Sequence, residues 1–201
     1  MTRIISGRAG SLGLAVPDAG TRPTSDRVRE SLFGALDAAD LLRGARVLDL
    51  YAGSGALGLE AASRGAATVD LVEKSPQAVT VIRRNVSRVQ TALRGSPDAA
   101  RLAVHRAGVE AYLRSAPVGV FDLVFLDPPY DLPDAELRTV LDLLVPALSP
   151  QATVIVERGA RSASPVWPTA LRADRHRRYG DTALWWAVRD GGQPDAESQS
   201  R

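Results

Sequence analysis

A glycine-rich segment and an acidic residue after it have the spacing of a nucleotide-binding site. Gly53, Gly55 and Gly58 come directly after a short apolar run, and Glu73 ends the next apolar run, 20 residues after Gly53. Glycines let the backbone approach a ligand closely, and an acid at the end of the second strand can accept hydrogen bonds from both ribose hydroxyls. The spacing therefore predicts that Glu73 binds a ribose and that Gly53 and Gly55 let the cofactor come close.

Asp49, just before the glycines, indicates which cofactor this is. The glycine pattern alone also fits an NAD-dependent oxidoreductase, which is the alternative from a different class. A carboxylate at this place would repel the pyrophosphate of a dinucleotide, whereas it would attract the ammonium and sulfonium groups of S-adenosylmethionine (SAM). Asp49 could also accept hydrogen bonds from the loop backbone, and the two roles are compatible. We therefore expect SAM as the cofactor.

The segment Asp127-Pro128-Pro129-Tyr130 follows another apolar run and could hold an amine. Each proline fixes φ and removes a backbone donor, so the remaining acceptors are the Asp127 carboxylate and the Pro128 carbonyl. A nitrogen with two N–H groups suits such a site, because its lone pair can then be directed at the sulfonium methyl. Tyr130 offers a flat face on which an extruded base can stack. The four residues are therefore predicted to be catalytic in methyl transfer to an exocyclic amine.

Alternating strands and helices between residues 46 and 157 must position these residues. Short apolar runs predict strands, and periodic apolar positions predict the helices between them. The strands are expected at 46–50, 68–73, 102–105, 120–126 and 153–157, and the helices at 56–64, 76–90, 109–114 and 134–144. Ser75 and Pro76 have the residue types of an N-cap and a first helical position. This alternation predicts an α/β fold with a mostly parallel, doubly wound sheet, whose carboxyl edge would bring the glycines and Asp127 to one crevice.

The two ends of the chain differ from this core. Strand-like pieces at 3–8 and 12–16 predict an N-terminal β-hairpin, followed by a helix at 26–36. The stretches 171–178 and 183–188 have no helix between them and predict an antiparallel C-terminal hairpin, which completes a seven-stranded sheet. The Gly-, Asp-, Ser- and Gln-rich end predicts a disordered tail. We therefore divide the chain into a basic hairpin arm (1–22), a catalytic domain (23–189) and a tail (190–201).

Composition excludes several classes of protein. The 201 residues contain no cysteine and two histidines, which excludes a disulfide scaffold, a thiol nucleophile and a metal site built on cysteines or several histidines. No apolar run is long enough to span a membrane, and the N-terminus lacks the apolar core of a signal peptide. The net charge of +2 is too small for a featureless polybasic binder. We expect a soluble, cytoplasmic protein without a metal.

The motifs together resemble those of a known family. Asp49, the glycines, Glu73 and residues 127–130 resemble the motifs of class I SAM-dependent amino-methyltransferases, which have a Rossmann-like fold. The stretch 22–33, together with 3–7 and 179–182, narrows the resemblance to the RsmD family of bacterial 16S ribosomal RNA guanine-N2 methyltransferases. The resemblance runs from about residue 2 to 188. It implies methyl transfer from SAM to N2 of a guanine in 16S ribosomal RNA, with this RNA or the assembling small ribosomal subunit as partner.

The resemblance also implies which residues contact the cofactor. In the family the stretch 22–33 lies against the cofactor, which implies that Arg22, Pro23 and Thr24 close over the methionine end of SAM. The other expected cofactor-binding residues are Asp49, Tyr51, Ala52, Gly53, Ser54, Gly55, Glu73, Lys74, Gly108 and Val109. Many relatives have an acid where this chain has Gly108, so backbone groups of 107–109, or Glu110, are expected to bind the adenine.

Arginines of the N-terminal arm are the expected RNA contact. Because the net charge is small, affinity for phosphates must come from local clusters. The expected RNA-binding residues are Arg3, Arg8, Arg27 and Arg29. Arginine clusters at 83–106 and 158–178 are the alternatives. A DNA adenine-N6 or cytosine-N4 methyltransferase is the nearest rival function, because it would use the same catalytic segment, and a non-catalytic RNA-binding module is a third.

Overall fold

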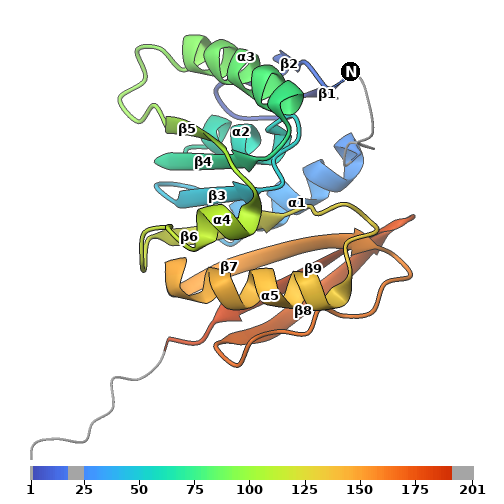
Figure 1. The fold of residues 1–201 in the computed structure, drawn as a ribbon. Coiled ribbons are helices and arrows are strands. Elements are labelled where there is room, and N and C mark those ends of the chain that lie inside the picture. The colour runs from blue at the N-terminus through green and yellow to red at the C-terminus, as the bar shows by residue number, and fades with distance from the viewer. Residues whose placement is uncertain (1, 18–24, 192–201) are drawn as a thin grey trace, which may run out of the picture.

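The computed structural model describes residues 2–17 and 25–191, and its centre is a seven-stranded sheet (Figure 1). The strands are β3 (Arg46–Leu50), β4 (Thr68–Glu73), β5 (Arg101–Arg106), β6 (Phe121–Leu126), β7 (Leu148–Gly159), β8 (Leu171–Tyr179) and β9 (Thr182–Arg189). Their order across the sheet is β5-β4-β3-β6-β7-β9-β8. The strands β3 to β7 pair in parallel, whereas β9 pairs antiparallel with both β7 and β8. The predicted sheet with its antiparallel C-terminal hairpin is confirmed.

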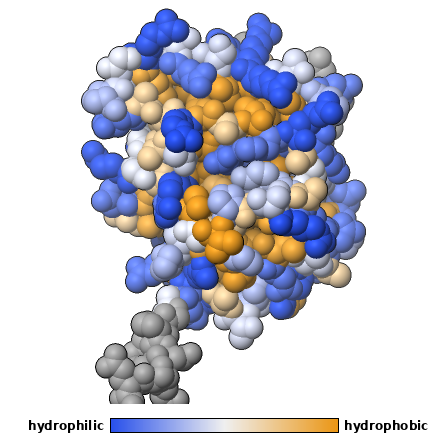
Figure 2. All heavy atoms as spheres, turned by 60° about the vertical axis from the view of Figure 1, so that its left-hand side comes forward, coloured by the Kyte–Doolittle hydropathy of each residue, from blue (hydrophilic) through white to orange (hydrophobic). Residues whose placement is uncertain are grey.

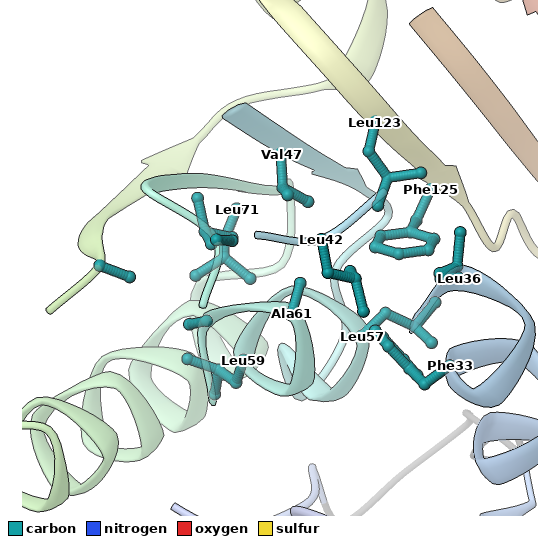
Figure 3. Packing of buried hydrophobic residues seen from close by; sticks show 14 of the residues in the cluster. Phe33, Leu36, Leu42, Val47, Leu57, Leu59, Ala61, Leu71, Leu123 and Phe125 are labelled. Carbon is teal, nitrogen blue, oxygen red and sulfur yellow. The ribbon is translucent and has the colours of Figure 1, made fainter. Parts of the chain in front are cut away.

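Helices cover both faces of this sheet. They are α1 (Asp26–Ala38), α2 (Ala56–Ser63), α3 (Pro76–Ala92), α4 (Val109–Leu113) and α5 (Asp134–Leu144), and the short 3₁₀ helix η1 (Val145–Ala147) follows α5. One buried cluster joins α1, α2 and α3 to the sheet, and a second joins α4 and α5 to it. In the first cluster, Phe33 of α1 packs on Phe125 of β6 with ring centroids 5.7 Å apart (Figure 3). Because β4 and β6 flank β3, the chain changes direction across the sheet beside β3, and such a switch point opens a ligand crevice.

Most predicted elements are confirmed, with differences at their ends. The Ser75 hydroxyl accepts a hydrogen bond from the N–H of Ala78 at 3.3 Å, and Pro76 is the first helical residue. β7 begins at Leu148 rather than at 153, because its first residue already pairs with β6. Asp190 donates its N–H to the carbonyl of Ala170 at 3.0 Å, so the folded part extends into the predicted tail. Residues 192–201 lie outside the described residues.

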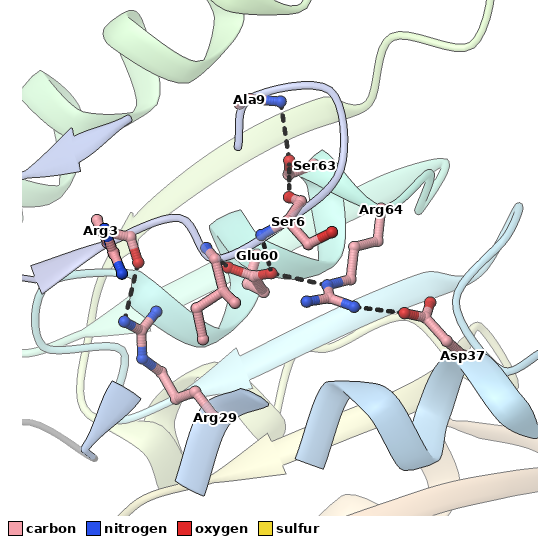
Figure 4. A network of polar contacts seen from close by, with 9 residues as sticks. Arg3, Ser6, Ala9, Arg29, Asp37, Glu60, Ser63 and Arg64 are labelled. Carbon is pink, nitrogen blue, oxygen red and sulfur yellow. Dashed lines mark hydrogen bonds and ion pairs between the residues drawn. The ribbon is translucent and has the colours of Figure 1, made fainter. Parts of the chain in front are cut away.

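The N-terminal hairpin is shorter than predicted and is anchored on α2. Its strands are β1 (Thr2–Arg3) and β2 (Gly13–Leu14), where the sequence predicted 3–8 and 12–16. The buried Glu60 carboxylate accepts hydrogen bonds from the N–H groups of Ile5 and Ser6, at 2.6 and 3.0 Å (Figure 4). The N–H of Arg8 donates to the Ser63 carbonyl at 2.8 Å. Polar groups of α2 therefore satisfy backbone donors that a longer strand ladder would have paired.

Gly7 lies where the hairpin crosses the end of α2, and its replacement tests this anchor. Its φ of +82° disfavours any side chain, and a Cβ there would overlap the Ser63 carbonyl oxygen. Gly7→Ala should destabilise the protein by about 3 kcal/mol, from backbone strain and steric overlap together. Chemical denaturation measures the loss. Gly13→Ala is the control, because its Cβ would meet no described atom within 4 Å; equal unfolding midpoints would show that the anchor contributes little.

The surface mixes apolar and charged areas. Figure 2 shows apolar side chains gathered near the middle of one face, with hydrophilic side chains around them. In the described part of the chain, no helix is both long and apolar enough to cross a membrane. The large apolar side chains that stand out into solvent there are Val118, Tyr130 and Val166. Of these, Tyr130 belongs to the catalytic segment predicted from the sequence.

Candidate cofactor and catalytic site

A cavity of about 450 Å³ opens at the carboxyl ends of β3, β4 and β6. Ligands of doubly wound sheets bind at this edge, and cofactor sites usually have volumes of roughly 300–1,000 Å³. The predicted site residues that line the cavity are Asp49, Tyr51, Ala52, Gly53, Ser54, Glu73, Lys74, Val109, Asp127, Pro128, Pro129 and Tyr130. The structure thus brings the predicted cofactor segment and the predicted catalytic segment to one cavity.

Glu73 stands at the end of β4 and is fixed by two backbone donors. Its carboxylate accepts a hydrogen bond from the N–H of Gly53 at 3.0 Å and another from the N–H of Ser75 at 2.8 Å. These bonds use one lone pair on each oxygen, so both oxygens can still accept from a ligand. The side chain is only partly buried and lines the cavity. This geometry suits the recognition of a diol.

The loop between β3 and α2 contains residues with positive φ, a conformation that non-glycine residues rarely adopt. Gly53 and Gly55 have φ values of +56° and +78°, and Tyr51, which carries a full side chain, has φ +62°. Such strain in a non-glycine residue is concentrated at functional sites. Gly55 does not line the cavity; a Cβ there would lie 3.3 Å from Leu59 Cδ1. Gly55 therefore permits the turn and the close packing of α2, whereas Gly53 lines the cavity.

Asp49 is a buried carboxylate at the end of β3, with 1% of its surface exposed. Its Oδ2 accepts a hydrogen bond from the N–H of Gly58 at 2.8 Å, so the bond to the loop's own backbone is present. Burial raises the pKa of Asp49 to about 7; the hydrogen bond from Gly58 opposes this, and the negative charges of Asp127 and Glu73 add to it. A bound cation would reverse part of this cost, because it favours the ionised carboxylate.

Residues 127–130 form the wall of the cavity that follows β6. Pro128 is buried and Asp127 is partly buried, whereas half of Tyr130 is exposed. The exposed ring leaves a face on which a planar base could stack. Asp127 and Asp49 come from the neighbouring strands β6 and β3, and the charge of Asp127 adds to the raised pKa of Asp49. The acceptors of the catalytic segment thus face the same space as the cofactor segment.

Comparison with known proteins identifies the family. The family model described as Conserved hypothetical protein 95 matches residues 2–188. The chain belongs to this family. The ribosomal RNA small subunit methyltransferase D of Escherichia coli (strain K12) is 33% identical to it over 97% of this chain and 94% of that protein. The solved structure of yhhF from Escherichia coli has a TM-score of 0.78 at 32% identity and covers 94% of this chain and 98% of that one. A hypothetical protein from Thermus thermophilus has a TM-score of 0.73 at 32% identity, with 92% and 98% covered.

These matches confirm the resemblance drawn from the motifs. The Conserved hypothetical protein 95 match covers the hairpin arm as well as the sheet, so the arm is part of the family's fold. The Rossmann-like architecture predicted from the alternating strands and helices is also confirmed, since the sheet order and the antiparallel end agree with a methyltransferase fold.

The predicted RNA-binding role of Arg29 is wrong. Its side chain is fully buried. Nη2 donates a hydrogen bond to the Arg3 carbonyl at 2.8 Å (Figure 4). It also donates to the Thr2 hydroxyl at 2.8 Å and to Asp26 Oδ1 at 2.7 Å. These contacts turn the guanidinium inward from α1 and tie it to β1. It does not face solvent, so RNA at the surface cannot reach it. By contrast, Arg3, Arg8 and Arg27 are exposed.

Two other groups of predicted cofactor contacts are residues 22–24 and the segment around Gly108. Arg22, Pro23 and Thr24 lie outside the described residues, so their predicted place over the methionine end of SAM stays a prediction. Gly108 is the residue before α4 and does not line the cavity, whereas Ala107 and Val109 on either side of it do. Backbone groups around Gly108 therefore remain the expected contacts for an adenine ring.

The sequence reasoning missed Asn85 of α3, which ties the N-terminal segment to the glycine loop. Its Nδ2 donates to the carbonyls of Ala15 at 2.8 Å and Ser54 at 2.9 Å, and its Oδ1 accepts from the N–H of Ala15 at 2.9 Å. Val16 and Pro17, the two residues after Ala15, line the cavity. The available signal was an amide on the buried stripe of α3 beside Ile82 and Val86, since buried polar groups are almost always hydrogen-bonded.

Proposed function

We propose that this member of the Conserved hypothetical protein 95 family transfers a methyl group from SAM to N2 of a guanine in small-subunit ribosomal RNA. The observation that carries the proposal is the single cavity shared by the loop of Asp49, the ribose-binding geometry of Glu73 and the segment 127–130. The relative from Escherichia coli is named as a small-subunit ribosomal RNA methyltransferase. The guanine N2 acceptor rests on the family resemblance of the motifs.

The residues of the cavity fit SAM. The carboxylates of Asp49 and Asp127 suit a ligand with an ammonium and a sulfonium, and Glu73 presents acceptors to a ribose. The apolar side chains of Leu57 and Val109 line the same cavity and suit the flat adenine and the methylene chain. When bound, SAM supplies an electrophilic methyl whose bond to sulfur breaks as the acceptor nitrogen forms its new bond.

The catalytic segment is proposed to hold and orient the acceptor amine. The Asp127 carboxylate and the Pro128 carbonyl accept the two N–H groups of the guanine amine, which directs the nitrogen lone pair into the cofactor half of the cavity. Tyr130 stacks on the base. After transfer the nitrogen has one hydrogen to lose, and the Asp127 carboxylate is placed to take it. The contribution of the protein is then mainly proximity and orientation.

RNA is proposed to lie against the exposed arginines of the arm. The side chains of Arg3 and Arg8 are 64% and 46% exposed, and they form surface ion pairs with Asp26 at 3.8 Å and with Asp98 at 3.3 Å. Exposed pairs of this kind contribute about 0–1 kcal/mol, so a phosphate can replace the carboxylate at small cost. Arg27 is exposed in the first turn of α1. Two of these arginines belong to the arm and Arg27 belongs to α1. Arg8 lines a second cavity, together with Arg43 and Asp98, which precede β3 and β5.

Removing two of these arginines should weaken RNA binding in a salt-dependent way. The double variant Arg3→Ala/Arg8→Ala should lower the slope of log affinity against log salt by about one unit for each phosphate that an arginine no longer binds, with SAM affinity unchanged. Filter binding at several salt concentrations measures it. The matched control is Arg83→Ala/Arg84→Ala, two exposed arginines of α3. A lowered slope in the control with no change in the arm variant would move the RNA site to α3.

Replacing Glu73 tests the ribose contact. Glu73→Ala should weaken SAM binding by about 1–3 kcal/mol, because the ribose hydroxyls and the N–H of Gly53 lose their acceptor. Isothermal calorimetry measures the affinity, and Glu30→Ala, an exposed acid of α1, is the control. An unchanged SAM affinity would show that the ribose does not bind at the end of β4.

The proposed function is tested by mapping the methylated nucleotide. The purified chain, labelled SAM and small ribosomal subunits or naked ribosomal RNA from a strain without this gene should give one methylated guanine, identified as N2-methylguanine by mass spectrometry. Comparing subunits with naked RNA identifies the true substrate. Methylation of adenine or cytosine in DNA would favour the rival methyltransferases, and binding of NAD with no binding of SAM would favour an oxidoreductase.

A further inference from the structure

Arg29 of α1 is a buried cation whose donors are only partly used. An arginine side chain carries five N–H donors. The Nη2 atom donates to Thr2, Arg3 and Asp26, whereas Nε and Nη1 are buried and have no hydrogen-bond partner among the described residues. Three N–H groups thus remain, which is costly in a side chain with no exposed surface. The contact with β1 explains one nitrogen of Arg29 and leaves two unexplained.

The place of Arg29 in the fold suggests what those donors are for. Arg29 lines the cofactor cavity, as do Val16 and Pro17 of the N-terminal segment. Two residues further along α1, the Ser31 hydroxyl forms a hydrogen bond of 2.7 Å with the Tyr179 hydroxyl. Tyr179 ends β8 at the same sheet edge as the end of β7. The first turns of α1 therefore lie at the carboxyl edge, where the cavity opens.

The charges around the cavity complete the argument. The acids that line it are Asp49, Glu73, Asp127 and Asp131, and the cations are Arg29 and Lys74. Lys74 follows the ribose-binding Glu73, so it belongs to the nucleoside half. A ligand whose other end is an amino acid brings one carboxylate into this acidic cavity. Among the lining residues outside the nucleoside half, Arg29 is the cation that can receive it, and an arginine is well suited to a carboxylate.

We propose that Arg29 binds the carboxylate of the methionine part of SAM. The inference rests on the proposed function, since it concerns a group of the cofactor. Nη2 holds the guanidinium in place through Thr2 and Arg3, and the remaining N–H groups face the ligand. The acids of the cavity then hold the positive groups of the same amino acid. Arg29 is thus a cofactor-binding residue, not an RNA contact.

A pair of ligands that differ in one carboxylate tests the inference. SAM and decarboxylated SAM both keep the adenosine, the sulfonium and the amine. Calorimetry should show that Arg29→Met weakens SAM binding about 10- to 100-fold and leaves the affinity for decarboxylated SAM within about twofold. The unmodified chain should bind decarboxylated SAM more weakly than SAM. Arg138→Met, on α5 at the opposite face of the sheet, is the control and should change neither affinity.

A second variant keeps the test independent of folding. Arg29→Lys retains a buried charge and should show a smaller loss with the same selectivity for SAM over decarboxylated SAM, with a cooperative thermal unfolding transition as the check on the fold. An equal loss for both ligands, or no loss for either, would overturn the inference and leave Arg29 with its contact to β1. If the unmodified chain binds neither ligand, the proposed function fails, and the inference with it.

Discussion

Replacing Asp127 with alanine should lower methyl transfer by about 1,000-fold while the protein still binds SAM. The substitution removes the acceptor that orients the amine, and misplacing a reacting group by about 1 Å alone can cost a factor of 100. Asp127 follows β6 on the proposed acceptor side of the cavity, and the substitution leaves the proposed ribose contact of Glu73 and the buried Asp49 unchanged. The SAM affinity should therefore change by less than about tenfold. Single-turnover kinetics at saturating SAM separate the two quantities.

Asp127→Asn is the matched variant for this experiment. It keeps the shape and one carbonyl acceptor but loses the negative charge, so its activity should lie between those of the alanine variant and the unmodified chain. Full activity of the Asp127→Ala variant would show that the carboxylate is not needed for methyl transfer. A loss of SAM binding as large as the loss of activity would instead assign Asp127 to the cofactor site.

Asp49→Asn should make the protein more stable at pH 8 and worse at binding SAM. The pKa of Asp49 is raised to about 7 in the fold, compared with about 3.9 in an unfolded chain. Between these values the folded state holds a proton that the unfolded state has lost, so stability falls as pH rises through this window. Three units correspond to roughly 4 kcal/mol. Asparagine removes this penalty and can still accept from the N–H of Gly58.

Urea denaturation at pH 5 and pH 8 measures this effect. The stability of Asp49→Asn relative to the unmodified chain should increase between the two values, since groups other than Asp49 titrate alike in both. SAM should bind the variant more weakly at pH 8, because its cationic groups lose an ionised partner. A relative stability that does not depend on pH would show that Asp49 is already ionised well below pH 7 in the folded chain.

The sequence predicts those parts of the fold whose signals lie within a few neighbouring residues. The run at 46–50, the turn glycines and the Ser75–Pro76 helix start each carry their signal within a few neighbouring residues, and the structure has all of them. The fate of Arg29 could not be foreseen in this way. It looks like a surface arginine until α1 is packed against β1, which places Thr2 and the Arg3 carbonyl beside it.

The same limit applies to the site. The sequence predicts that Glu73 and Asp127 meet because parallel strands end at one edge of a sheet. The wall formed by Val16 and Pro17 is not predicted, because it depends on Asn85, which lies 70 residues after its partner Ala15 in the chain. The two backbone donors to the buried Glu60 carboxylate are equally unpredictable from local sequence, since they lie 54 and 55 residues away; only its third donor, Arg64, is close in the chain. Polar contacts between residues far apart in the sequence produce no periodic pattern from which they could be predicted.

The anchoring of the hairpin on α2 has a consequence for the order in which the protein acquires its shape. The segment from Ile5 to Ala15 leaves the ribosome before its partners Glu60, Ser63 and Asn85. Closing loops of this length costs entropy before any contact repays it. The contacts of this segment with α2 and α3 must therefore wait until both helices have been synthesised and folded, and the N-terminal side of the cavity cannot be completed before α3.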